Sequence, residues 1–132
     1  MGSRHRSYGQ SLVEMSLVLP LLLLIIFGLV DFGLAYTTNV LIRGAVAEGG
    51  YYASQHPGDA QGVRDRITSE LSDLSPAVTD SDITINECVS GSSGPQTEII
   101  VAYTYHVIFG LAGSGPTITL RNGTVVPQFG AC

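Results

Sequence analysis

The feature that most constrains the fold is a long apolar segment near the N-terminus, from Leu12 to Tyr36. Only Glu14 and Asp31 are charged within it, and the stretch from Met15 to Val30 carries no charge. At ~1.5 Å per residue, a helix over this segment reaches roughly 37 Å, which exceeds the ~30 Å hydrocarbon core of a bilayer. The sequence therefore predicts a membrane-spanning helix.

The charges on the two sides of this segment predict its orientation. Arg4 and Arg6 precede it, whereas acidic residues predominate after it. Under the positive-inside rule, the N-terminus lies in the cytoplasm and the C-terminal part outside. A secretory signal peptide cut after Ala35 is the alternative, although the apolar stretch is longer than the usual ~7–15 residues.

Helical spacing of apolar residues continues past Tyr36 to a breaker at His56, Pro57 and Gly58. A second amphipathic helix is expected over residues 60–74, with Asp59 as its N-cap.

The remainder of the chain changes to the alternating period of β-strands. Alternation occurs over residues 82–88, 98–107 and 117–120, with connections at 90–95 and 110–116. We therefore predict an α+β fold: a long N-terminal transmembrane helix, then a small head of one helix packed on a sheet of three or four antiparallel strands. The expected division is a basic leader over 1–9, the transmembrane and extended helix over 10–56, and the exported α+β head over 57–132.

The two cysteines, Cys88 and Cys132, both lie in the part expected to be exported. In an oxidising space a disulfide between them is the natural interpretation, and two unrelated thiols are the alternative. In the chain-entropy model, closing this loop stabilises the folded state by about 4 kcal/mol.

Composition and motif content argue against several functional classes. The net charge is −5 and there is no basic run downstream of the leader, so nucleic-acid binding is not expected. His5, His56 and His106 have no second ligand at metal spacing, and no nucleophile pair or phosphate-binding loop occurs. We therefore expect neither an enzyme nor a bound cofactor or metal.

The most informative string is Gly9-Gln10-Ser11-Leu12-Val13-Glu14, because it places a carboxylate at the mouth of an apolar helix. Such a charge costs up to ~2.5–3.5 kcal/mol at mid-membrane on translocon-type scales, so it needs a reason. A glycine followed five positions later by glutamate resembles the processing site of type IV prepilins. The longer string GQSLVEMSLVLPLLLLIIFGLVDFGLAY resembles the TadE-like minor pseudopilins of tight-adherence (Flp) pilus systems. The matching elements are Gly9, Gln10, Val13, Glu14, Leu19, Pro20, Gly28, Asp31, Phe32 and Gly33.

This resemblance implies cleavage after Gly9 by a prepilin peptidase, with Gln10 as the new N-terminus. Glu14 would face the α-amino group of an adjacent subunit and set the register of assembly; a carboxylate without a partner at headgroup level is the alternative. The implied partners are membrane lipid, other pilin or pseudopilin subunits, the peptidase, an inner-membrane platform and its secretion ATPase. The implied location is a bacterial cytoplasmic membrane, with possible entry into a surface pilus.

Further residues are candidates for helix packing. Glycines permit close approach of another backbone, and Pro20 either loosens the helix or has little effect. Asp31 marks the outer interface or makes an intersubunit contact. The candidates are Pro20, Gly28, Asp31, Gly33, Gly44 and Gly49. The rival function is a monomeric, single-pass binding module that keeps its leader.

Overall fold

The computed structural model describes residues 7–91, 94–108 and 116–128, without the side chains of residues 7 and 8. Its helices are α1 (Ser7–Gln55) and α2 (Ala60–Glu70), followed by a short 3₁₀ turn, η1 (Asp80–Asp82). The strands are β1 (Ile83–Gly91), β2 (Gly94–His106) and β3 (Thr117–Pro127). The α+β architecture expected from the sequence is confirmed.

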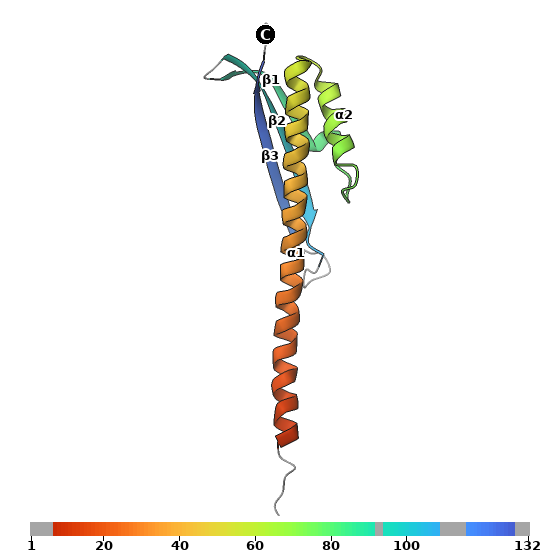
Figure 1. The fold of residues 1–132 in the computed structure, drawn as a ribbon, viewed down its shortest axis with the longest axis vertical. Helices are drawn as coiled ribbons and strands as arrows, with labels where there is room; N and C mark the ends of the chain where they lie inside the picture. The colour runs from red at the N-terminus through yellow and green to blue at the C-terminus, as the bar shows by residue number, and fades with distance from the viewer. Residues whose placement is uncertain (1–6, 92–93, 109–115, 129–132) are drawn as a thin grey trace, which may run out of the picture.

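The 49-residue helix α1 dominates the shape of the molecule. Its N-terminal half projects alone, and its C-terminal half forms one wall of the head, beside the sheet and α2 (Figure 1). Because no proline follows Pro20 until Pro57, nothing in the sequence interrupts the helix between these two parts. The membrane-type segment and the head therefore share one continuous element.

The part of α1 inside the head carries an inward stripe of small and medium side chains. These recur every three or four residues and turn one helix face toward the core. They are Ala35, Thr38, Ile42, Val46, Gly49 and Ala53.

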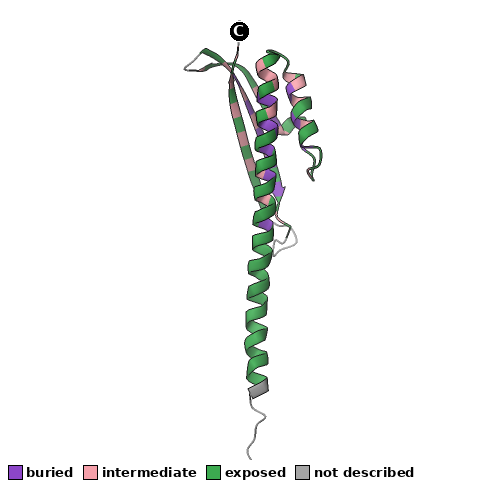
Figure 2. Cartoon of the chain, viewed as in Figure 1, coloured by how far each residue is buried: buried purple, intermediate pink, exposed green. Residues whose placement is uncertain are grey.

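The sheet has the order β1-β2-β3, and both strand pairs are antiparallel. Alternate residues of the central strand β2, such as Ile99, Val101 and Tyr103, point into the core and are buried. The core also includes Ile42 of α1 and Ile67 of α2. Burial is confined to the head, and the lower half of α1 is exposed throughout (Figure 2).

The structure adds detail to the expected packing. The C-terminal half of α1 provides the main helix surface against β2 and β3, and α2 packs on α1. Helix α2 also ends at Glu70 and not at Leu74. Leu71 and Leu74 nevertheless face the core, because a turn with a 3.1 Å bond from Leu74 N–H to the Leu71 carbonyl continues the inward pattern.

Strand β1 contains an irregularity that the alternating pattern does not predict. Its pairing with β2 shifts between Asn86 and Val89, and Cys88 has a positive φ of 57°. Strand β3 is longer than the expected 117–120. Residues 1–6 of the expected leader, most of the 110–116 connection and Cys132 lie outside the described residues, and residues 7–9 form the start of α1.

Candidate anchoring and assembly site

The predicted processing motif lies in the first turns of α1. Gly9 and Gln10 are exposed, and the Gln10 side-chain amide donates a 3.3 Å hydrogen bond to Glu14 one turn later. This amide is neutral, and Glu14 forms no ion pair with any described residue. The structure therefore places the predicted cleavage residues and the predicted register residue within about one and a half helical turns of each other.

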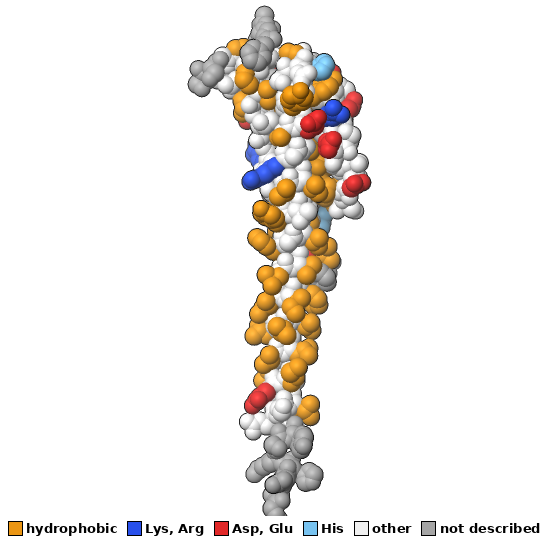
Figure 3. All heavy atoms as spheres, viewed as in Figure 1, with side chains coloured by type: hydrophobic (Ala, Val, Ile, Leu, Met, Phe, Trp, Pro, Cys, Tyr) orange, Lys and Arg blue, Asp and Glu red, His pale blue; other side chains and the backbone are white. Residues whose placement is uncertain are grey.

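Above this motif, α1 is apolar on every side. Leu12 and Leu17 are each 72% exposed, and large apolar side chains cover the helix surface up to the head (Figure 3). From Glu14 to Asp31 the helix rises about 26 Å, close to the thickness of a hydrocarbon core. A single helix of this length and hydropathy fits a membrane anchor.

Asp31 marks the point where the exposed helix enters the head. Its side chain is 8% exposed, and its Oδ1 accepts a 3.0 Å hydrogen bond from the backbone N–H of Ile108, just beyond β2. Burial, and secondarily the negative charge of Asp31, raise the pKa of Tyr105. Asp31 therefore joins α1 to the base of the head within one chain, a role not anticipated from the sequence.

The spacing of residues along α1 contained a signal for the contact of Asp31 with the head. Asp31 lies four residues before Ala35 and seven before Thr38, so it begins the inward stripe of α1. The partner Ile108 gives no sequence signal, because any residue supplies a backbone N–H.

The glycines proposed for helix packing divide into two groups. At Gly49 an added Cβ would lie 2.7 Å from Cγ1 of Ile67, so this glycine permits α1 and α2 to pack closely. At Gly28, Gly33 and Gly44 an added Cβ would meet nothing within 4 Å. Pro20 lies in the exposed lower part of α1. Within one chain, then, only Gly49 of this set makes a close helix contact.

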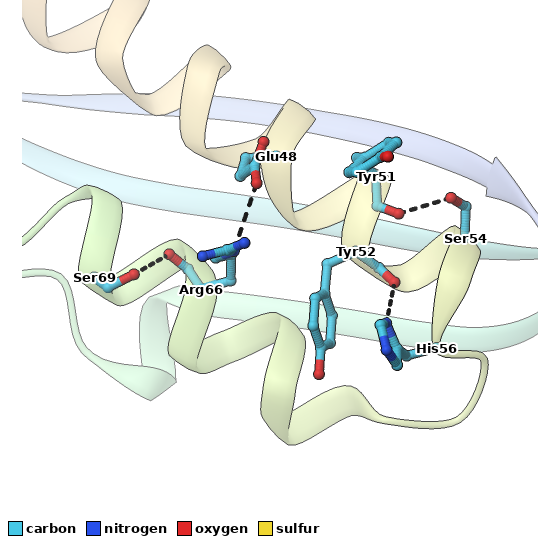
Figure 4. A network of polar contacts seen from close by, with 7 residues as sticks. All are labelled: Glu48, Tyr51, Tyr52, Ser54, His56, Arg66 and Ser69. Atoms are coloured by element: carbon cyan, nitrogen blue, oxygen red, sulfur yellow. Dashed lines mark hydrogen bonds and ion pairs between the residues drawn. The ribbon is translucent and has the colours of Figure 1, made fainter.

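A polar network joins α1 to α2 at the top of the head (Figure 4). The Tyr52 ring stacks on His56 with centroids 4.3 Å apart, and its hydroxyl donates a 2.9 Å hydrogen bond to Asp59. Asp59 is the N-cap of α2 as predicted, since it accepts a 2.9 Å bond from the Gly62 N–H. That bond and the one from Tyr52 lower the pKa of Asp59. The bond to Asp59 raises the pKa of Tyr52.

Cys88 lies at the irregularity in β1, beside the C-terminal end of β3. The Gln128 side-chain oxygen accepts a 3.3 Å hydrogen bond from the Cys88 N–H. Gln128 precedes Cys132 by four residues, so the chain approaches Cys88 shortly before it reaches Cys132. The Cys88–Cys132 disulfide stays a prediction, because Cys132 lies outside the described residues.

No group of three or more His, Cys, Asp or Glu in residues 7–91, 94–108 and 116–128 is arranged to hold a metal ion. The arrangement instead combines a single exposed apolar helix with a small α+β head fixed to its upper half. These features define a class of protein that a single N-terminal helix can anchor in a membrane.

Within that class, the comparison with known families gives a match to the part of the chain that forms α1. Residues 9–50 match the family model described as TadE-like protein. This segment is thus TadE-like, as the sequence motif indicated, and the match covers the expected processing motif, the apolar segment and the part of α1 that enters the head. Nothing matches in the comparisons with curated proteins and with solved structures.

Proposed function

We propose that this protein is a minor pilin, or pseudopilin, of a tight-adherence (Flp) pilus or secretion system. The observation that carries the proposal is the TadE-like match over residues 9–50, which includes both Gly9 and Glu14. The exposed apolar surface of α1 supports it, because a pilin helix needs such a surface both in the membrane and in a helical bundle. The head stands outside the bacterial cytoplasmic membrane, and the N-terminus is cytoplasmic.

In this proposal a prepilin peptidase removes residues 1–9 by cutting after Gly9. The Gly9–Gln10 bond lies in the first turns of α1, where glycine lowers helix stability by up to ~1 kcal/mol relative to alanine. Local unwinding of this end therefore costs little, which makes the bond accessible to a peptidase.

After cleavage, Glu14 pairs with the new α-amino group of Gln10 on an adjacent subunit. Within residues 7–91, 94–108 and 116–128 of the single chain, Glu14 accepts a hydrogen bond from the neutral amide of its own Gln10 and forms no ion pair. A carboxylate in an apolar setting is tolerated when an opposite charge accompanies it, so assembly supplies what the isolated chain lacks. Further partners are other pilin subunits, the inner-membrane platform and the secretion ATPase.

The first test is intact mass and N-terminal sequencing of the protein from its native membrane. We expect a mature chain that begins at Gln10, and a Gly9→Ala variant that keeps its leader. Gly28→Ala is the matched control, because this glycine also lies in exposed α1 with open space around it; it should be processed normally. A wild-type chain that retains Met1 would favour the membrane-anchored binding module, and one that begins at Tyr36 would indicate a signal peptide.

The second test separates cleavage from assembly. We expect Glu14→Ala to be processed but to enter assemblies poorly, because the charge that pairs with the neighbouring α-amino group is gone. Ser16→Ala is the control, since the Ser16 hydroxyl donates a hydrogen bond to the Val13 carbonyl of its own helix and carries no charge. Normal assembly of Glu14→Ala would contradict the register role of Glu14.

A further inference from the structure

An open groove lies between α1 and β3, away from the processing motif. Its volume is about 340 Å³. It is lined by Arg43, Val46 and Ala47 of α1 and by Asn122, Gly123 and Thr124 of β3.

The charged group of this groove is the guanidinium of Arg43. The Nε of Arg43 donates a 3.1 Å bond to Oδ1 of Asn122, which fixes the orientation of the Asn122 amide. Its Nδ2 is buried and has no hydrogen-bond partner among the described residues. Arg43 forms no ion pair with any described residue. The exposed guanidinium of Arg43 suits a carboxylate, because its fork of N–H groups can donate two parallel hydrogen bonds to the two carboxylate oxygens.

The carboxylate of Glu70, on the other side of the head, lies at about the same distance from the membrane as Arg43. Helix α2 runs antiparallel to α1 (Figure 1), and its Arg66 lies 3.5 Å from Glu48 of α1. Glu70 is four residues further along α2, which places it about 6 Å closer to the membrane than Arg66. Measured along the axis of α1, Glu70 is therefore level with Gly44, one residue from Arg43. Glu70 is exposed and forms no ion pair with any described residue.

The groove and α2 lie on different sides of α1. Arg43 and Glu48 are five residues apart, so their side chains leave the helix about 140° apart, and β3 and α2 lie on opposite flanks of α1 (Figure 1). Two copies anchored in one membrane with the same orientation hold their heads at the same height. A neighbour placed beside the groove can therefore present its α2 to it.

We propose that the Arg43–Asn122 groove of one copy binds the Glu70 carboxylate of a second copy. The contact is heterologous, because each copy uses its groove toward one neighbour and its α2 toward the other, and repetition gives a ring or a helical array. The inference rests on the proposed function only in that the copies are anchored side by side in one orientation.

The test is self-association of the full-length chain in lipid vesicles, measured by energy transfer between donor-labelled and acceptor-labelled copies. We expect Arg43→Glu and Glu70→Arg each to weaken association by about tenfold, because each leaves a charge facing a like charge. The double variant, with both charges exchanged, should associate as the wild type does. Circular dichroism of each variant checks that the head remains folded.

Two variants control for the change in net charge. Arg121→Glu changes an exposed arginine of β3 outside the groove lining, and Glu87→Arg changes an exposed acid of β1. Neither should alter association.

Several outcomes would overturn the inference. They are absence of wild-type association, association that survives Arg43→Glu, and failure of the double variant to recover. None of them bears on cleavage after Gly9, which is measured separately. Retention of the leader with charge-reversible association would contradict the proposed function and leave the groove contact in place.

Discussion

Asp31 is the residue at which the membrane-type helix and the head are joined. Its buried carboxylate accepts the Ile108 N–H at 3.0 Å. We expect Asp31→Ala to lower the free energy of unfolding of the head by about 1–3 kcal/mol, because a part-buried hydrogen bond from the Ile108 N–H to a charged acceptor is lost. Asp31→Asn keeps a carbonyl oxygen at the same position and should cost less.

Denaturant unfolding in detergent measures this difference, and hydrogen exchange at the Ile108 amide locates it. If Asp31→Ala unfolds at the wild-type denaturant concentration, with Ile108 still protected from exchange, the joint is not formed by this bond.

Gly49 and Gly44 provide a matched pair on α1. An alanine Cβ at position 49 would come 2.7 Å from the buried Ile67, whereas at position 44 it meets open space. We expect Gly49→Ala to destabilise the head by about 1–3 kcal/mol through overpacking. Gly44→Ala should stabilise the helix by up to ~1 kcal/mol.

Thermal unfolding of both variants in detergent decides between these expectations. Equal unfolding temperatures for the two variants would show that the contact between Gly49 and α2 is not close-packed in solution.

Residue roles were predictable from the sequence where they depend on local chemistry. Asp59 was expected to cap α2, and it does, because an N-cap needs only a side-chain acceptor before a helical pattern. The bond between Asp31 and Ile108 joins residues 77 positions apart, and no local rule contains that pairing.

At the scale of elements, the junction of α1 and α2 should respond to pH. Hydrogen bonds from the Gly62 N–H and from Tyr52 lower the pKa of Asp59 in the folded state. Its contribution to stability is therefore fully present above the unfolded pKa of ~3.9 and is lost as the pH falls through the lower folded value. The pKa of Tyr52 is raised in the folded state, so its contribution to stability is present below the unfolded pKa of ~10 and is lost as the pH rises through the higher folded value.

Thermal unfolding from pH 2.5 to 7 checks the acid side. Asp59→Asn keeps an oxygen for the cap but does not titrate, so its unfolding temperature should fall less steeply with acid than that of the wild type. Asp73→Asn controls for removal of one exposed acid. Identical pH profiles for wild type and Asp59→Asn would count against this linkage.

Element types were predicted better than their ends and their packing. The apolar spacing at Val63, Ile67 and Leu71 identified α2, and it also suggested the continuation to Leu74 that the structure replaces with a turn. A turn and a further helical turn both bring Leu74 against the core, so the spacing of apolar residues does not distinguish them. Apolar spacing also does not identify the element that a helix packs on. Helix α2 was expected to pack on the sheet, and in the structure it makes its main contacts with α1.

For the whole molecule, the α+β class and the single apolar helix followed from patterns within continuous stretches of chain. The groove of Arg43 and Asn122 did not. It depends on which edge of the sheet meets α1, and residues 79 positions apart carry no pattern that links them. Close helix packing at Gly28, Gly33 and Gly44 stays a prediction, because an added Cβ at each of them meets nothing within 4 Å in the single chain.

The proposed export of the head predicts the redox state of the whole protein. If the head is outside the membrane, Cys88 and Cys132 meet oxidising conditions and pair. The hydrogen bond between Gln128 and Cys88 supports this, because Cys132 follows Gln128 by four residues in the sequence. We expect neither thiol to react with a membrane-impermeant maleimide on intact cells until a reductant is added.

Reduction should also lower the free energy of unfolding of the head by about 4 kcal/mol, the entropy cost of opening this loop. Denaturant unfolding with and without reductant measures it, and a Cys88→Ser/Cys132→Ser variant, insensitive to reductant, is the control. Labelling of both cysteines without reductant would show an exported head without the disulfide. Labelling only after the membrane is permeabilised, again without reductant, would place the head in the cytoplasm and reverse the predicted orientation of α1.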